Sequence, residues 1–140
     1  MYHRYMNPKF WGPHGWYFLH SVTMHYPKNP SEQEKQIYFN FFKSVENVLP
    51  CEKCAYHYSK NLEKLPLEPA LESRDTLVRW LISVHNEVNK ETGKREYTYE
   101  EVIDEYTHKM NNIDSDSTLV YKVIIVGLIV FIGYLYTKKK

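Results

Sequence analysis

The sequence predicts an all-α protein: a compact four-helix bundle with a short fifth helix, followed by a C-terminal transmembrane helix. Three observations support this fold class. Apolar residues recur at helical spacing in successive segments of the first 110 residues, and no useful length of chain alternates as a β-strand would. Residue pairs with the spacing of helix-capping boxes precede two of these segments. A long apolar run lies near the C-terminus.

The first helix is expected from about Pro13 to His25, since proline is tolerated early in a helix and Pro27 ends it. One face of this helix gathers Trp16, Leu19, His20 and Thr23. The second helix begins at Ser31, which forms a capping box with Glu34. Its apolar stripe is expected to be Ile37, Phe41, Phe42, Val45 and Val48.

The third helix starts near Cys51, and the fourth runs from about Ser73 to Thr92, with Gly93 as its C-terminal cap. The inward side of the fourth helix is expected to hold Leu77, Trp80, Leu81, Val84, His85 and Val88. A second capping box, Thr98 with Glu101, opens a fifth helix that reaches toward residue 110.

Composition excludes several classes of function. The formal net charge of +1 argues against a nucleic-acid-binding protein, which needs a basic face. None of the five glycines forms a Rossmann fingerprint or a phosphate-binding loop, which excludes both kinds of nucleotide site. The aromatic content of 16% suits a chain that surrounds a flat ligand or fills a small core densely.

The apolar run Leu119–Tyr136 predicts a membrane anchor, because a helix of this length is about 27 Å long, close to the thickness of a bilayer core. We therefore expect a folded domain at 1–110, a polar linker at 111–118, a transmembrane helix at 119–137 and a basic tail at 138–140. The N-terminus has no apolar segment of a signal peptide, so the folded domain is expected in the cytosol.

Both cysteines lie in one C-x-x-C motif, Cys51 to Cys54. A helix N-terminus stabilises a thiolate, and Lys53 adds positive charge, so a redox-active dithiol is favoured. A structural zinc site would need two histidines to complete it, and His57 is poorly spaced for that role. Two reduced, inert thiols are the third reading. No metal ligand set is predicted.

Two aromatic clusters accompany the motif. Trp16 and His20 are four residues apart on one helix, as are His85 and Asn89 on another, and Lys94 follows the second pair. Together they indicate a pocket with aromatic walls, polar contacts and one cation. Such a pocket suits an adenine or isoalloxazine ring with a pyrophosphate.

Three sequence blocks, Trp11–His20, Leu49–Ala55 and Trp80–Lys94, resemble in order and spacing the Erv/ALR family of FAD-linked sulfhydryl oxidases. The resemblance implies a helical bundle that binds FAD, with Cys54 next to the flavin and Cys51 as the outer cysteine that a substrate dithiol attacks. The electrons would pass through FAD to O₂ and yield H₂O₂. The cofactor contacts that it implies are Trp11, Gly12, Trp16, His20, Tyr26, Trp80, His85, Asn86, Val88, Asn89, Lys94 and Tyr97.

The layout is similar to that of the sulfhydryl oxidases of large DNA viruses, which implies an endoplasmic-reticulum-derived or virion membrane. Since the chain has no further cysteine to relay electrons, a dithiol protein, thioredoxin-like in kind, is expected to reach Cys51 directly. The family resemblance and the excess of aromatic residues at 38–42 imply a homodimer. The alternative from another class is a tail-anchored membrane adaptor whose C-x-x-C is structural and could bind zinc.

Overall fold

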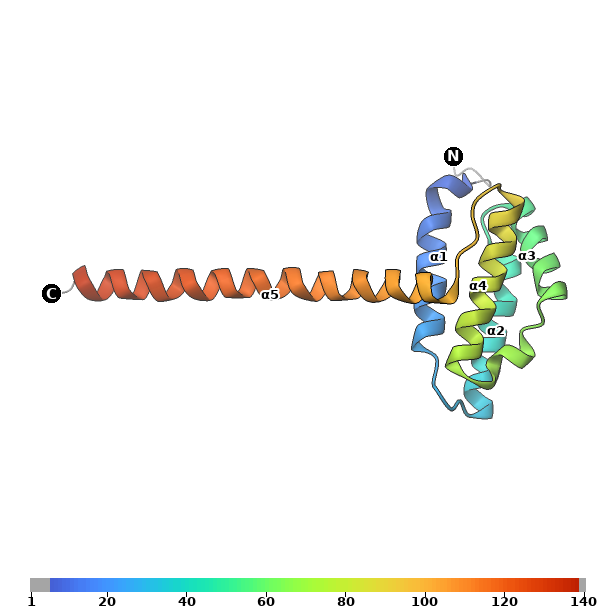
Figure 1. Cartoon of the computed structure of the whole chain (residues 1–140), viewed down its shortest axis with the longest axis horizontal. Coiled ribbons are helices and arrows are strands. Elements are labelled where there is room, and N and C mark those ends of the chain that lie inside the picture. The colour runs from blue at the N-terminus through green and yellow to red at the C-terminus, as the bar shows by residue number, and fades with distance from the viewer. Residues whose placement is uncertain (1–5, 139–140) are drawn as a thin grey trace. The chain divides into compact units, whose positions relative to one another are not determined.

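The computed structural model describes residues 6–138, except for the side chains of 113–119 and 133, and every element in that range is helical. The chain divides into two compact units, 1–99 and 100–140. The first unit holds five elements, which are α1 (Pro8–His25), α2 (Glu32–Val48), α3 (Glu52–Lys64), the 3₁₀-helix η1 (Glu68–Glu72) and α4 (Arg74–Glu91) (Figure 1). The second is formed by α5 (Tyr99–Lys138). The prediction of an all-α bundle is confirmed.

Side-chain caps begin the helices of the bundle. Ser31 and Glu34 form the predicted capping box of α2, and Ser73 caps α4 by accepting a hydrogen bond from the amide of Thr76. The first helix begins five residues earlier than expected, at Pro8, because the side chain of Asn7 accepts a hydrogen bond from the amide of Lys9 and caps it. Pro13 therefore lies inside α1.

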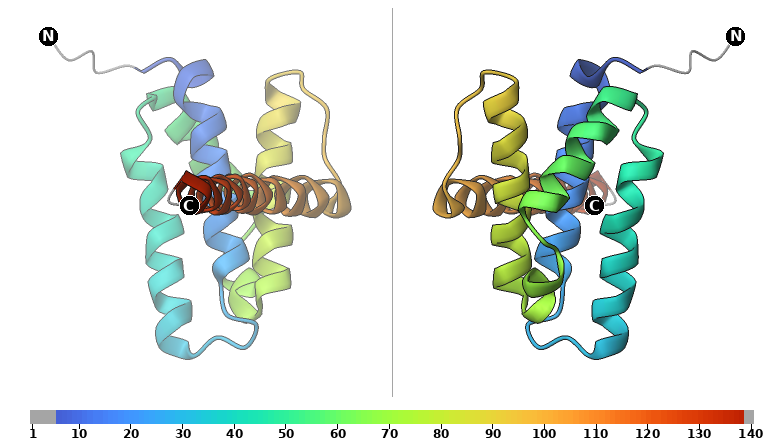
Figure 2. Two further views of the ribbon diagram at one scale, coloured as in Figure 1. Left: turned by 90° about the vertical axis from the view of Figure 1, so that its left-hand side faces the viewer. Right: turned by 90° about the vertical axis from the view of Figure 1, so that its right-hand side faces the viewer.

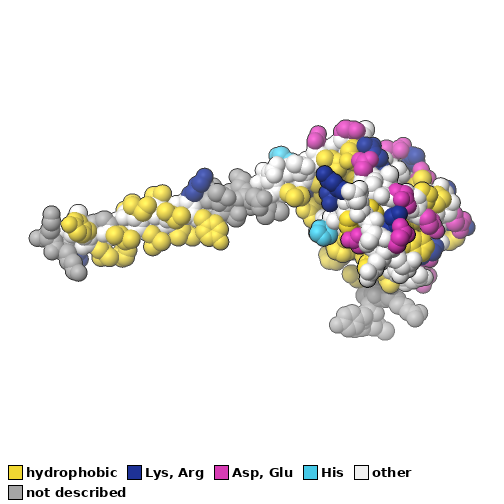
Figure 3. Space-filling model, turned by 90° about the horizontal axis from the view of Figure 1, so that it is seen from below, with side chains coloured by type: hydrophobic (Ala, Val, Ile, Leu, Met, Phe, Trp, Pro, Cys, Tyr) yellow, Lys and Arg dark blue, Asp and Glu magenta, His cyan; other side chains and the backbone are white. Residues whose placement is uncertain are grey.

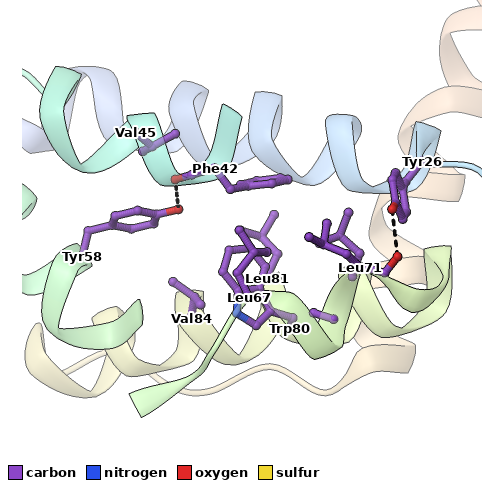
Figure 4. Close-up of a cluster of buried hydrophobic side chains, with 11 residues drawn as sticks. Tyr26, Phe42, Val45, Tyr58, Leu67, Leu71, Trp80, Leu81 and Val84 are labelled. Carbon is purple, nitrogen blue, oxygen red and sulfur yellow. Dashed lines mark hydrogen bonds between the residues drawn. The ribbon is translucent and has the colours of Figure 1, made fainter. Parts of the chain in front are cut away.

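The core of the bundle is formed by eleven buried apolar side chains from α2, α3, η1 and α4, together with Tyr26 after α1 and Leu67 before η1 (Figure 4). Polar atoms within it are paired with backbone carbonyls. The hydroxyl of Tyr58 donates to the carbonyl of Phe42 over 3.0 Å, and the hydroxyl of Tyr26 donates to that of Leu71 over 2.8 Å (Figure 4). The indole of Trp80 donates to the carbonyl of Leu65. Because these polar groups keep their hydrogen bonds, burying them costs little.

The buried stripe of α2 differs from the expected one. Phe42 and Val45 are buried as predicted, but Ile37 and Val48 are exposed. Tyr38 and Leu49 pack against the core instead. Tyr38, Phe42, Val45 and Leu49 follow the spacing i, i+4, i+7, i+11, so the true stripe is rotated by about one residue from the expected one.

The helix α5 is one continuous element of 40 residues. We expected it to end near residue 110, before a linker at 111–118 and a separate apolar helix. The backbone is helical throughout that segment, because no glycine or proline occurs between Tyr99 and Val126 to interrupt it. Its stretch Val120–Lys138 is long and apolar enough to cross a membrane, with a mean hydropathy of 2.0, and its described hydrophobic side chains are exposed (Figure 3).

Candidate functional site: a disulfide, a ring wall and a folded-back loop

A disulfide joins Cys51 and Cys54 at the start of α3, with their Cα atoms 5.2 Å apart. Cys51 is the N-cap residue, and its sulfur accepts a hydrogen bond from the amide of Cys54 over 3.2 Å. The free amides and the dipole of the helix N-terminus stabilise a thiolate formed here on reduction. Cys51 is only 4% exposed, whereas Cys54 is half-buried.

The start of α1 and the end of α4 lie at the same end of the bundle as this disulfide (Figures 1 and 2). The amide of Met6 donates to the carbonyl of Pro50 over 3.1 Å, and the indole of Trp11 donates to the carbonyl of Met6. On the other side, Nδ1 of His57 lies 2.6 Å from Oε2 of Glu91 in the last turn of α4. Three elements far apart in sequence therefore meet around the two cysteines.

An aromatic wall connects α1 and α4. The indole of Trp16 stacks on the imidazole of His85, with centroids 3.9 Å apart and planes 8° from parallel. Nε2 of His20 is 3.1 Å from Nδ1 of His85, so one of the two rings donates a hydrogen bond to the other. Burial lowers the pKa of His20 from 6.5 to about 4, which keeps this ring neutral at physiological pH. Trp16, His20 and His85 are thus brought together.

One helical turn beyond His85, the side chain of Asn89 is also buried, and its Nδ2 has no hydrogen-bond partner among the described residues. Its backbone carbonyl accepts from the amide of Lys94 over 2.8 Å, which folds the chain back after α4. Gly93 permits this reversal with φ +67°, a conformation that side chains disfavour. Lys94 follows Gly93 and is exposed.

The loop after α4 is held by Asn86. Its Nδ2 donates to the carbonyl of Tyr97 over 2.8 Å, and its Oδ1 accepts from the amide of the same residue over 2.9 Å. The guanidinium of Arg95 lies 4.0 Å from the centroid of the Tyr97 ring. Since Oδ1 and Nδ2 of Asn86 are both hydrogen-bonded to the backbone of Tyr97, this side chain fixes the conformation of the loop.

Two of the predicted cofactor contacts, Tyr26 and Trp80, belong to the hydrophobic core. Each has its polar atom bonded to a backbone carbonyl, and Tyr26 follows the end of α1 opposite to Met6. Val88 is half-buried on α4. A Cβ atom at Gly12 would meet nothing within 4 Å, so the space beside this glycine is open.

Two residues of interest were not singled out from the sequence in these roles. His57 was considered only as a zinc ligand, although it pairs with Glu91. Asn61 was not considered, although its position seven residues after Cys54 puts a polar side chain in the middle of an otherwise apolar helix face. That interruption of the apolar spacing was a usable signal.

The candidate site comprises the Cys51–Cys54 disulfide, the stacked rings of Trp16 and His85, the cation Lys94, and the buried amide of Asn89, which lacks a hydrogen-bond partner. These groups fit a ligand with a planar ring system and an anionic part. No group of three or more His, Cys, Asp or Glu side chains converges as a metal site within the described part of the chain. The chemistry available is therefore thiol–disulfide exchange next to a bound flat molecule.

Comparison with known proteins agrees with this geometry. The model of the Erv1 / Alr family matches residues 13–108. A probable FAD-linked sulfhydryl oxidase of Acanthamoeba polyphaga mimivirus is 48% identical over 100 residues, covering 71% of this chain and 70% of the relative. The mitochondrial FAD-linked sulfhydryl oxidase ERV1 of Saccharomyces cerevisiae is 35% identical over 86 residues, and the match spans only 44% of its length.

Solved structures resemble the fold as well. The crystal structure of the FAD-binding domain of Erv1 from Saccharomyces cerevisiae superimposes with a TM-score of 0.63 at 33% identity, covering 67% of this chain and 88% of that one. The yeast Erv1 core gives a TM-score of 0.61 at 32% identity, covering 69% and 82%.

Proposed function

The chain belongs to the Erv1/Alr family, and from this premise we propose that it is an FAD-linked sulfhydryl oxidase that forms disulfides in protein dithiols. The observation that carries the proposal is the disulfide at the start of α3, at the same end of the bundle as the last turn of α4 and its buried Asn89. The alternative of a membrane adaptor with a structural C-x-x-C has no support in the comparisons.

The reaction of the two cysteines is thiol–disulfide exchange. A substrate thiolate attacks the sulfur of Cys51, which forms a mixed disulfide and releases the thiolate of Cys54. The second substrate thiolate then attacks the substrate sulfur of the mixed disulfide, so the substrate leaves as a disulfide and both cysteines are left reduced. The helix N-terminus lowers the cost of the thiolate released at Cys54.

A bound FAD would supply a two-electron acceptor for the two thiols, so that their oxidation closes the Cys51–Cys54 disulfide again, and a route for those electrons to O₂ with formation of H₂O₂. The residues proposed to hold FAD are those of the ring wall and of the loop after α4. Trp16 and His85 offer flat surfaces, Asn89 offers an unpaired N–H, and Lys94 offers a charge for the phosphates. His20 holds the ring of His85 by a hydrogen bond and, being neutral, adds no charge to the site.

The substrate is proposed to be a small dithiol protein, thioredoxin-like in kind, which reaches Cys51 directly because this chain has no second cysteine pair. Since Cys51 is largely covered, the backbone around Met6 and Pro50 has to yield when the substrate docks. A homodimer is supported by the exposed side chains of Phe18 and Ile37, whose burial against a second copy would be favourable.

We also propose that 119–137 anchors the enzyme in a membrane, with the oxidase domain at 1–110 on the cytosolic side. The support is the length, hydropathy and exposure of Val120–Lys138. The membrane is proposed to be an endoplasmic-reticulum-derived or virion membrane, since viral sulfhydryl oxidases are among the relatives.

The proposal is tested by gel filtration of the detergent-solubilised full chain with flavin absorbance recorded, followed by O₂ consumption and H₂O₂ formation with dithiothreitol. We expect about one FAD per chain and stoichiometric peroxide. His85→Ala, which removes the stacking partner of Trp16, should lose FAD while staying helical. A folded, colourless wild-type protein that does not bind added FAD would overturn the proposal.

A further inference from the structure

Asn61 carries a buried side-chain amide without a partner. The residue is 0% exposed, and neither Oδ1 nor Nδ2 has a hydrogen-bond partner among the described residues. Leaving a buried polar group unsatisfied costs free energy because its hydrogen bonds to water are lost, so such groups are rare in native proteins and each needs an explanation. Here both halves of one carboxamide are unsatisfied, which indicates a missing partner that offers a donor and an acceptor.

The position of Asn61 on α3 relates it to the disulfide. Cys54, Tyr58 and Asn61 follow the spacing i, i+4, i+7 and share one face of the helix. The hydroxyl of Tyr58 is paired with the carbonyl of Phe42 within the protein, whereas the amide of Asn61 is left over. Seven residues of helix separate Asn61 from Cys54 by about 10 Å along the axis, a span that a tricyclic ring can cover.

Two side-chain contacts show which part of α4 lies level with Asn61. His57 pairs with Glu91, and Lys64 pairs with Glu87 over 3.3 Å. Asn61 lies between His57 and Lys64 in sequence, so it is level with the segment 87–91. That segment contains Asn89, whose buried Nδ2 also has no hydrogen-bond partner among the described residues. The two unpartnered amides thus lie at about the same height along the bundle, Asn61 on α3 and Asn89 on α4.

We propose that the carboxamide of Asn61 is a cofactor-binding group that hydrogen-bonds the pyrimidine edge of the flavin ring, an inference that rests on the proposed function. The carboxamide places a C=O and an N–H side by side, and the pyrimidine edge of the ring presents an N–H and C=O groups in the same way. Reduction puts negative charge on this part of the ring, so the N–H of Asn61 stabilises the reduced flavin more than the oxidised one.

The experiment compares FAD with 3-methyl-FAD, which lacks the N–H of the pyrimidine ring, on the full-length chain in detergent. Wild type should bind the methylated analogue at least tenfold more weakly than FAD. Asn61→Leu, of similar size, should bind both equally. The same variant should have a lower flavin midpoint potential, by about 30 mV for a tenfold loss of preference for the reduced ring. The matched control is Thr23→Val, since Thr23 is equally buried but its hydroxyl is already bonded to the carbonyl of His20.

The outcomes separate this inference from the proposed function. Wild type that binds no FAD overturns both. Wild type and Asn61→Leu that bind FAD with the same discrimination and the same potential overturn the role of Asn61 alone. Thermal unfolding of the flavin-free proteins provides the second measurement. Asn61→Leu should be no less stable than wild type, because the amide has no partner to lose, and a clear loss of stability would mean that the amide is satisfied within the protein and would also overturn the role.

Discussion

His57 and Glu91 join the helix that carries the disulfide to the last turn of α4, with Nδ1 and Oε2 2.6 Å apart and both side chains about one-third exposed. This pair holds the cysteines against the segment that contains Asn89. It connects two parts of the site that are far apart in sequence.

Replacing His57 by alanine should therefore loosen the contact between α3 and α4. We expect a loss of about 1 kcal/mol in the free energy of unfolding, in the range of partly buried ion pairs, together with weaker FAD binding. Lys60→Ala is the control, because Lys60 pairs only within α3, with Glu63. Urea unfolding and flavin titration measure both effects, and equal behaviour of the two variants would contradict the connecting role of His57.

The roles of the two cysteines differ, and trapping can separate them. In Cys54→Ser the thiolate of Cys51 should attack the disulfide of an oxidised thioredoxin-like protein, which forms a mixed disulfide and releases one thiolate of that protein. FAD should stay bound, and O₂ consumption with dithiothreitol should stop. In Cys51→Ser the adduct should be absent. Mass spectrometry of the non-reduced proteins gives the readout. Trapping by Cys51→Ser instead would reverse the assignment, which the greater exposure of Cys54 would then explain.

The loop after α4 depends on Asn86. Asn86→Asp keeps an acceptor for the amide of Tyr97 but sets a carboxylate against the carbonyl of Tyr97, which has lost its donor. We expect about 1 kcal/mol of destabilisation and faster hydrogen exchange at the amides of 94–97. Asn40→Asp is the matched control, because the side chain of Asn40 only accepts a bond from exposed Gln36. Unchanged exchange in Asn86→Asp would show that the loop is held otherwise.

His20 should make the flavin-free protein sensitive to acid. Its pKa is about 4 in the folded state and 6.5 when exposed, because burial disfavours the charged ring. Between these values the unfolded chain binds a proton that the folded chain does not, so stability falls as the pH drops from 6.5 to 4, by at most about 3 kcal/mol. Above pH 6.5 this contribution is constant. His20→Gln should flatten the pH dependence of urea unfolding, and a slope equal to that of wild type would exclude His20 as its source.

Membrane attachment should depend on the apolar stretch of α5. Placing arginine at both Ile124 and Ile129, whose side chains are exposed, should release the protein from vesicles in a flotation assay, since each arginine in a bilayer core costs about 2.5–3.5 kcal/mol or more. Thr137→Arg, at the end of the stretch, should still float with the vesicles. If the double variant also floats, a different part of the chain attaches the protein.

The misjudged boundaries have local physical causes. The predicted start of α1 at about Pro13 rests on the tolerance of an early helical position for proline, yet Asn7 and Pro8 supply a cap and a first residue that suit a helix better. The end of the fifth helix was expected near residue 110, but the polar residues that follow do not end a helix by polarity alone, and α5 continues through them. On α2 five apolar residues occur within 37–42, so the sequence allows two stripes, and packing against α3 and η1 selects the one that contains Tyr38.

What the sequence determined by itself is local: the helical class, the cap at Ser31, and the C-x-x-C at a helix start. Each depends on residues within a turn or two of one another, where spacing alone decides the contact. Only the tertiary structure stacked Trp16 on His85, paired His57 with Glu91, and buried the amide of Asn61 without a partner. Those outcomes depend on how separate helices face each other, which the packing of the whole core decides and no single segment encodes.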